Sequence, residues 1–274
     1  MSHMAHVDIG RSGELAYQVT GDGEPLVFIH GALIADEFES LTPEPALRGF
    51  RRVTYHRRGY GESSSVVPGA TMADHAADCA GLLANLDLAP AHVVGHSFGG
   101  SIALQLALDA PELVQSLILL EPGMFLGDTA GAYRAALADN QRRYRELGAE
   151  AMVTDFFKPR FGHDWRARFD RVHPELVAQA IVYAPTFFEH EIACIGTWSF
   201  SERDLPRIPH PTLAVLGAVS DGLWDRFGET QRVLLRSLPR GEGFVLPGAS
   251  HAMQLDNPSE LAVAIAAFCE RQRR

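Results

Sequence analysis

The sequence contains few cysteines and no excess of positive charge. Three of its 274 residues are cysteine, Cys79, Cys194 and Cys269, and they are scattered without the spacing of a metal site. A sparse, odd-numbered set is typical of buried thiols in a reducing compartment, so we expect a cytoplasmic protein. The 24 basic residues stand against 34 acidic ones, for a net charge of -10. This balance argues against nucleic acid or an anionic membrane as the main partner.

Long apolar runs and cofactor motifs are also missing. No apolar stretch approaches the length that spans a bilayer, so no membrane partner is expected. The chain has no GxGxxG fingerprint, P-loop or HExxH pattern, so we expect neither a nucleotide cofactor nor a metal. No repeat and no secretory signal pattern is recognised. The opening Met-Ser-His-Met resembles a cloning remnant and is left out of the fold prediction.

The chain does contain short apolar strands that alternate with helical stretches. Its apolar fraction of 46% is ample for the core of one large domain. A short antiparallel pair over 7–9 and 15–19 is joined by a glycine-containing turn at 10–13. Continuous apolar runs, typical of strands buried on both faces, follow at 26–30, 53–56, 117–120, 212–216 and 243–246. Helical patterns cover about 71–86, 98–109, 224–238 and 258–270. This alternation predicts an α/β fold with a mostly parallel, doubly wound sheet.

Residues 124–209 break this rhythm. They show helical patterns at 133–147, 149–157 and 174–184 and no buried strand. Aromatic residues gather at Phe156-Phe157 and again between Phe187 and Phe200. We therefore predict a core domain of residues 1–122 and 210–274 with an inserted helical lid, or cap, of residues 123–209. An apolar cap would form a pocket that excludes water, although its aromatics could instead pack only against one another.

The most informative stretch is Gly95-His96-Ser97-Phe98-Gly99, a G-x-S-x-G pattern. Strand-forming residues precede it and helix-forming residues follow it, so Ser97 is predicted at a strained strand-to-helix turn with small neighbours. The N–H groups that open the following helix would stabilise an anion formed beside the hydroxyl. The five-residue pattern also occurs in glycine-rich turns without chemistry. The strand before it and the helix after it favour the catalytic interpretation.

A serine hydroxyl needs a base to take its proton, and that base is nearly always a histidine held by a carboxylate. His251 is the one histidine after His210, and it lies in the loop that follows the last predicted strand. His30, Ser97 and Glu121 lie at or just past the ends of predicted parallel strands, so we expect them to open on one crevice. The histidines at 56, 92 and 96, which belong to predicted strands or the serine turn, are weaker candidates for the base. Ordinary polar roles are expected for those at 163, 173 and 190.

Four motifs make the chain resemble the α/β-hydrolase superfamily over nearly its whole length. They are His30-Gly31, Arg58-Gly59-Tyr60-Gly61-Glu62-Ser63, the pattern around Ser97, and Gly248-Ala249-Ser250-His251. The resemblance implies an oxyanion hole formed by the backbone N–H groups of Phe98 and Ala32, with Leu33 as the alternative to Ala32. It gives the arginine of the turn at 57–61 a structural role only.

The acid that orients His251 has two candidates. The position that most of the family uses, after the strand that follows the cap, is occupied by Ser220, and Asp221 comes one residue late. Glu121 ends the strand after the nucleophile helix, where some haloalkane dehalogenases and the zearalenone-type lactonases carry their acid. A buried carboxylate needs a partner, so we favour Glu121 over Asp221. Their other possible roles are an ion pair with a cap arginine and a turn or helix-capping residue, respectively.

These features predict a serine hydrolase that cleaves a carboxylic ester or lactone through an acyl-enzyme. The expected catalytic residues are Ser97, His251 and Glu121. The expected substrate is a small, largely apolar molecule, and no cofactor is required. Alternatives are hydrolysis of a C–C bond in a β-diketone-like substrate, a cofactor-free oxygenase, and a non-catalytic relative that binds a small molecule. Substrate identity and oligomeric state are left open.

Overall fold

One eight-stranded sheet organises the chain. The computed structural model describes residues 4–10, 13–124 and 126–273, so the predicted turn at Arg11-Ser12 and most of the opening remnant lie outside the described residues. The strands lie in the order β1-β2-β4-β3-β5-β6-β7-β8, with β1 and β2 paired antiparallel, β2 and β4 likewise, and the remaining pairs parallel. Their bounds are β1 Ala5–Asp8, β2 Glu14–Thr20, β3 Glu24–Ile29, β4 Phe50–Tyr55, β5 Ala91–His96, β6 Val114–Leu120, β7 Thr212–Gly217 and β8 Gly241–Leu246. The predicted α/β class and mostly parallel sheet are confirmed.

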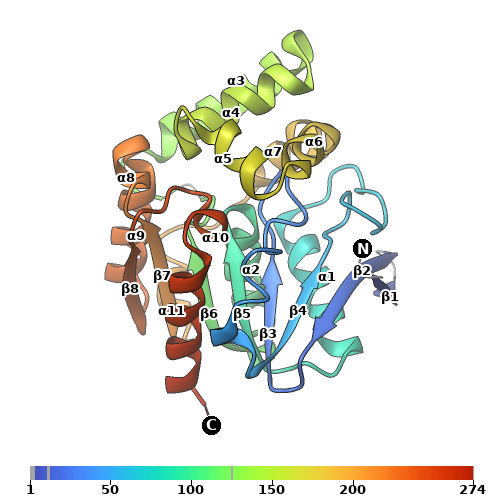
Figure 1. The fold of residues 1–274 in the computed structure, drawn as a ribbon, viewed down its shortest axis with the longest axis vertical. Coiled ribbons are helices and arrows are strands. Elements are labelled where there is room, and N and C mark those ends of the chain that lie inside the picture. Colours follow the sequence, from blue (N-terminus) through green and yellow to red (C-terminus); the bar gives the residue numbers. More distant parts are fainter. Residues whose placement is uncertain (1–3, 11–12, 125, 274) are drawn as a thin grey trace.

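Helices cover both faces of this sheet (Figure 1). Successive residues of a central strand point to opposite faces, so Val93 joins one apolar core and Val94 the other. The first core includes side chains of α1 (Met72–Asn85), α2 (Phe98–Asp109) and α9 (Arg226–Ser237), and the second includes side chains of α11 (Pro258–Arg271). The start of α1 agrees with the predicted helix from about residue 71. It is fixed because Thr71 accepts from the Asp74 N–H while the Asp74 carboxylate accepts from the Thr71 N–H.

In the described part of the chain, five α-helices follow β6 and precede β7, with a π-helix over Thr186–Glu191 before the last of them. They are α3 (Ala130–Leu147), α4 (Ala149–Phe161), α5 (Trp165–Val172), α6 (Glu175–Val182) and α7 (Ile192–Thr197). Figure 1 shows them lying across the end of the sheet at which the parallel strands finish. Within the described residues this stretch contains no strand, as predicted. None of the helices in the described part of the chain is both long and apolar enough to cross a membrane.

Two differences from the predicted helices affect the site. The helix predicted to end at residue 157 continues through Pro159 to Phe161, where Gly162 with φ +90° ends it. The helix predicted over 224–238 is present as α9 (Arg226–Ser237), but a short helix that was not predicted, α8 (Ser220–Leu223), precedes it, with the extended Trp224 after it. The first difference places Arg160 and Phe161 on the last turn of a cap helix. The second keeps Asp221 on a separate short helix.

Candidate active site

Ser97 lies at the turn from β5 into α2 with φ 50° and ψ -117°, backbone angles that residues other than glycine rarely adopt. Its neighbours must be small because the turn is closely packed. A Cβ added to Gly99 would lie 2.1 Å from the Ile29 carbonyl oxygen, and one added to Gly95 would lie 2.5 Å from the Gly99 oxygen. The strained serine expected from the G-x-S-x-G pattern is therefore present, at the start of a helix.

His251 is held by Glu121. Its Nδ1 lies 2.6 Å from Glu121 Oε2, and the Gly217 N–H donates to the other carboxylate oxygen at 2.8 Å. Both side chains are buried, with the two residues 2% and 3% exposed. Asp221, the competing candidate, is exposed on α8, and its carboxylate lies beside Gly228. Of the two predicted acids, the structure brings Glu121 to the histidine.

Burial controls the charge of this pair. Desolvation lowers the pKa of His251 well below its usual range, and the nearby His96 and Arg160 act in the same direction. The imidazole is therefore neutral at pH 7, the state in which it can accept a proton. Desolvation also raises the pKa of Glu121 to about 7, although the Gly217 N–H favours the ionised form. Above that pH the carboxylate is charged and orients the ring.

Ser97 and His251 line the same small cavity between the core and the cap. The His251 ring stacks on Phe227, with ring centroids 4.3 Å apart, and also faces Phe161 at 5.8 Å. The cavity measures about 20 Å³, which is room for roughly one water molecule. Among the described residues its lining includes Ser97 but neither His30 nor Glu121, so the prediction that these three open on one crevice was wrong for two of them. Glu121 is bonded to the Nδ1 side of His251, and His30 accepts from the Arg57 N–H.

The loop after β3 is fixed by an arginine of the predicted turn. Arg57 donates to the carbonyl oxygens of His30 at 3.0 Å and Gly31 at 2.7 Å, and its guanidinium pairs with Glu191 of the cap. The Leu33 N–H donates to the Tyr60 hydroxyl at 3.1 Å, so that group is already used. Ala32 lines the cavity. The structural role implied for the arginine agrees with these contacts, and Ala32 is the better placed of the two candidate donors.

A second histidine–carboxylate pair escaped the sequence reasoning. Glu37 and His96 are both buried, and His96 Nδ1 lies 2.9 Å from each Glu37 oxygen. His96 Nε2 lies 2.9 Å from the His251 carbonyl oxygen, and the Gly31 N–H donates to Glu37 at 2.7 Å. Although burial opposes a charge on His96, Glu37 raises its pKa above the usual value. The pair joins the β3 loop, the serine turn and the His251 loop. No local pattern marks it, since 59 residues separate its members.

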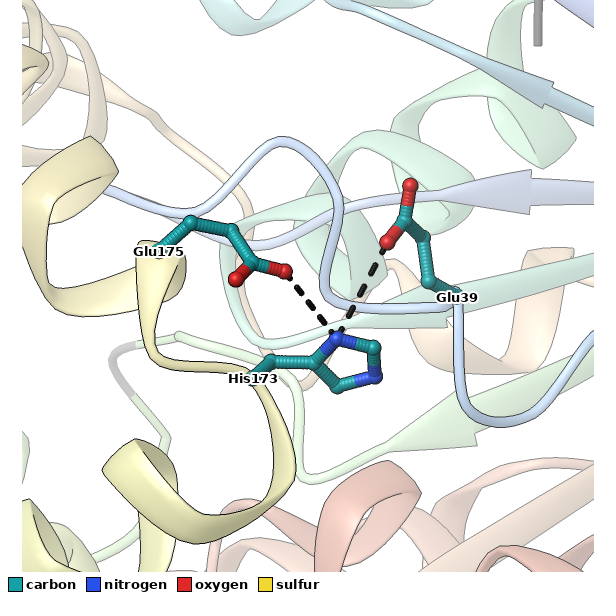
Figure 2. Close-up of side chains that lie close together, drawn as sticks. All are labelled: Glu39, His173 and Glu175. Carbon is teal, nitrogen blue, oxygen red and sulfur yellow. Dashed lines mark hydrogen bonds and ion pairs between the residues drawn. The ribbon is translucent and has the colours of Figure 1, made fainter. Parts of the chain in front are cut away.

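One group of side chains has the spacing of metal ligands within the described residues, namely Glu39, His173 and Glu175. Figure 2 shows His173 Nδ1 facing both carboxylates, at 3.1 Å from Glu175 and 3.9 Å from Glu39. The other ring nitrogen lies 2.7 Å from the Ser40 hydroxyl. Both glutamates are exposed, so the contacts are accounted for as surface ion pairs that join the β3 loop to the start of α6.

The family model for the alpha/beta hydrolase fold matches residues 24–258. A protein of Synechocystis sp. with the provisional name non-heme chloroperoxidase is 29% identical over 91% of this chain and 94% of its own length. The fold also matches an esterase of Thermogutta terrifontis (TM-score 0.78, 23% identity, all of both chains) and an N-acyl homoserine lactone degrading enzyme (TM-score 0.75, 24% identity, 96% of this chain and all of the other). The chain belongs to the α/β-hydrolase fold family.

Proposed function

We propose that this chain is a serine hydrolase that cleaves a carboxylic ester or lactone. The observation that carries the proposal is a buried histidine, held by a buried carboxylate and with its pKa lowered by desolvation, that shares a cavity with a serine on a strained turn. A histidine in this state can take the proton of a serine hydroxyl. The esterase and the lactone-degrading enzyme with the same fold agree with this class of substrate.

In the proposed reaction, Ser97 Oγ attacks the substrate carbonyl while His251 Nε2 takes its proton. The N–H groups of Ala32 and Phe98 hold the developing oxyanion. His251 then gives its proton to the leaving alkoxide, which separates from the acyl-serine. Water, deprotonated by the same nitrogen, attacks the acyl group and releases the acid. Glu121 remains ionised throughout and stabilises the charge that forms on His251.

The cap is proposed to comprise residues 123–209, resting on a core of residues 1–122 and 210–274. A cavity of about 20 Å³ is far smaller than the hundreds of cubic ångströms that a small organic ligand occupies. Substrate entry therefore requires the cap helices to move away from the serine turn.

A cytoplasmic location stays a prediction. It rests on the three cysteines, which are free and buried.

The test is covalent labelling with a fluorophosphonate, followed by turnover of aryl esters, aliphatic esters and lactones. We expect one label per chain on Ser97, and we expect Ser97→Ala to lose both the label and several orders of magnitude in kcat. Turnover that persists in Ser97→Ala would exclude an acyl-serine. Labelling without cleavage of any ester or lactone, together with cleavage of a β-diketone, would instead favour the C–C hydrolase alternative.

A further inference from the structure

Arg160 is a buried cation at the wall of the catalytic cavity. It lies on the last turn of α4 with 6% of its surface exposed, and it lines the cavity together with Ser97 and His251. Its backbone oxygen accepts from the His251 N–H at 3.4 Å. The backbone of Arg160 is thus held at the loop that carries His251, although the residue belongs to the cap.

The surroundings of Arg160 contain no counter-charge. Its guanidinium carbon lies 3.5 Å from the ring centre of Phe156 and 4.4 Å from that of Trp224, and Nη1 donates to the Phe156 oxygen at 2.6 Å. The Tyr133 side chain is its other polar neighbour. No carboxylate of the described residues forms an ion pair with it. Burial without such a partner lowers the pKa of Arg160 below its usual value.

Two other buried arginines have the carboxylate partner that Arg160 lacks. Arg57 pairs with Glu191, and Arg58 pairs with Asp78. A desolvated guanidinium is costly without an anion, and paired burial is the usual solution. Arg226, a second buried arginine without an ion pair, lies over Tyr133 at 3.7 Å and also faces Trp224. Two guanidiniums therefore share one aromatic cluster, and Glu229 is the carboxylate that acts on Arg226 from nearby.

Two carboxylates lie close to the cavity. Glu37, which lines it, is matched by His96. Glu121 lies outside the lining, accepts from the Gly217 N–H and is matched by His251 only when the ring takes a proton. Among the described residues that line the cavity, Arg160 is the charge without a partner. A substrate that brought its own anion would supply the missing partner, and the N–H groups of a guanidinium suit a carboxylate.

We propose that the substrate is an ester or lactone with a free carboxylate, which binds to Arg160 while the scissile carbonyl lies at Ser97. This inference rests on the proposed function and narrows its substrate class. It also revises the expectation of a largely apolar substrate: the aromatic cap holds the carbon chain, and one charged end is recognised at the junction of α4 with Trp224.

The test compares two esters that share a leaving group and a chain length, p-nitrophenyl pentanoate and the mono-p-nitrophenyl ester of glutaric acid, with the succinic and adipic half-esters as length variants. We expect kcat/KM to favour at least one half-ester over its neutral counterpart. The quantity to compare is the ratio of kcat/KM for the half-ester to kcat/KM for the neutral ester of the same chain length. Arg160→Met should lower this ratio by about 10- to 100-fold, the usual range for a hydrogen bond to a charged group. The ratio cancels any loss common to both esters.

Arg143→Gln is the matched control, because Arg143 of α3 is a partly exposed cap arginine that pairs with Asp155 and does not line the cavity. It removes the same charge from the same helical region, so the ratio should not change. A second measurement does not need turnover: titration of glutarate into Ser97→Ala and into the Ser97→Ala, Arg160→Met double variant. Glutarate should bind the first and bind the second at least tenfold more weakly.

A neutral ester preferred by the wild type at every length, or a ratio that Arg160→Met leaves unchanged, would overturn the inference. Equal affinity of glutarate for the two Ser97→Ala proteins would do so as well. If no ester is cleaved at all while glutarate binds through Arg160, then the proposed hydrolase function fails and the anion site stands.

Discussion

Glu121→Gln tests the proposed catalytic arrangement most sharply. In the wild type one carboxylate oxygen accepts from the Gly217 N–H at 2.8 Å and the other faces His251 Nδ1 at 2.6 Å. A glutamine in the same rotamer must place its oxygen toward Gly217, because two N–H donors cannot face each other. Its NH₂ group then points at Nδ1 and donates to it. The neutral imidazole is forced to carry its proton on Nε2.

A ring protonated at Nε2 cannot accept the Ser97 proton, so the variant should lose kcat rather than substrate binding. In a serine protease triad the equivalent change costs about 10⁴-fold in kcat, which is roughly 5 kcal/mol of barrier. We expect a loss of the same order here. Asp221→Asn is the matched control, since Asp221 is exposed and the hydrogen bond to His251 Nδ1 is made by Glu121. It should change kcat less than about threefold, the scale of a harmless surface substitution.

The assay is steady-state hydrolysis of a p-nitrophenyl ester by both variants, with thermal melting to verify that each is folded. The reasoning would be refuted if Asp221→Asn lost more activity than Glu121→Gln. It would also be refuted if folded Glu121→Gln kept more than about a tenth of the wild-type kcat, because a wrong tautomer cannot be tolerated so well.

Two further predictions concern the same charged groups. Burial raises the pKa of Glu121 to about 7 and lowers that of His251. We therefore expect kcat/KM to fall as the pH drops through about 7, because Glu121 takes up a proton there and stops orienting the His251 ring. A kcat/KM that stays constant from pH 8 to pH 5.5 would contradict this prediction. Glu37→Gln leaves one oxygen to accept from both the Gly31 N–H and His96 Nδ1, so urea denaturation should show a loss of about 1–3 kcal/mol. kcat should also fall, since the Glu37–His96 pair fixes the loop that carries Ala32. A free energy of unfolding within about 0.5 kcal/mol of the wild-type value would exclude this stabilising role of Glu37.

The features that sequence reasoning predicted well are local ones. The helix start near residue 71 and the turn at Ser97 are each specified within a few consecutive residues, so their backbone geometry follows from nearby side chains. The preference for Glu121 came from burial, because four apolar residues precede it and a buried carboxylate must find a partner. That partner proved to be His251, 130 residues away.

Glu37 and Arg160 could not be predicted, for different physical reasons. Glu37 lies in an irregular loop, and its pairing with His96 depends on how two separate strands approach each other. Arg160 follows Pro159, which lacks an N–H and normally marks the end of a helix. The proline lies in the last turn of the cap helix, which continues two residues past it. This continuation brings Arg160 to the cavity wall. Tertiary packing decides both positions.

Three of the four non-glycine residues with positive φ in the described chain are Leu33, Ser97 and Glu121, each just beyond the end of a parallel strand. Left-handed angles at such residues are unfavourable by roughly 1–3 kcal/mol each, against a typical total stability of about 5–15 kcal/mol. At Leu33 the cost is offset by burial, because its side chain is fully enclosed in the apolar core and glycine there would leave a cavity. Ser97 contributes no such apolar burial, so a Ser97→Gly protein is expected to lose the proposed activity and to be at least as stable as the wild type.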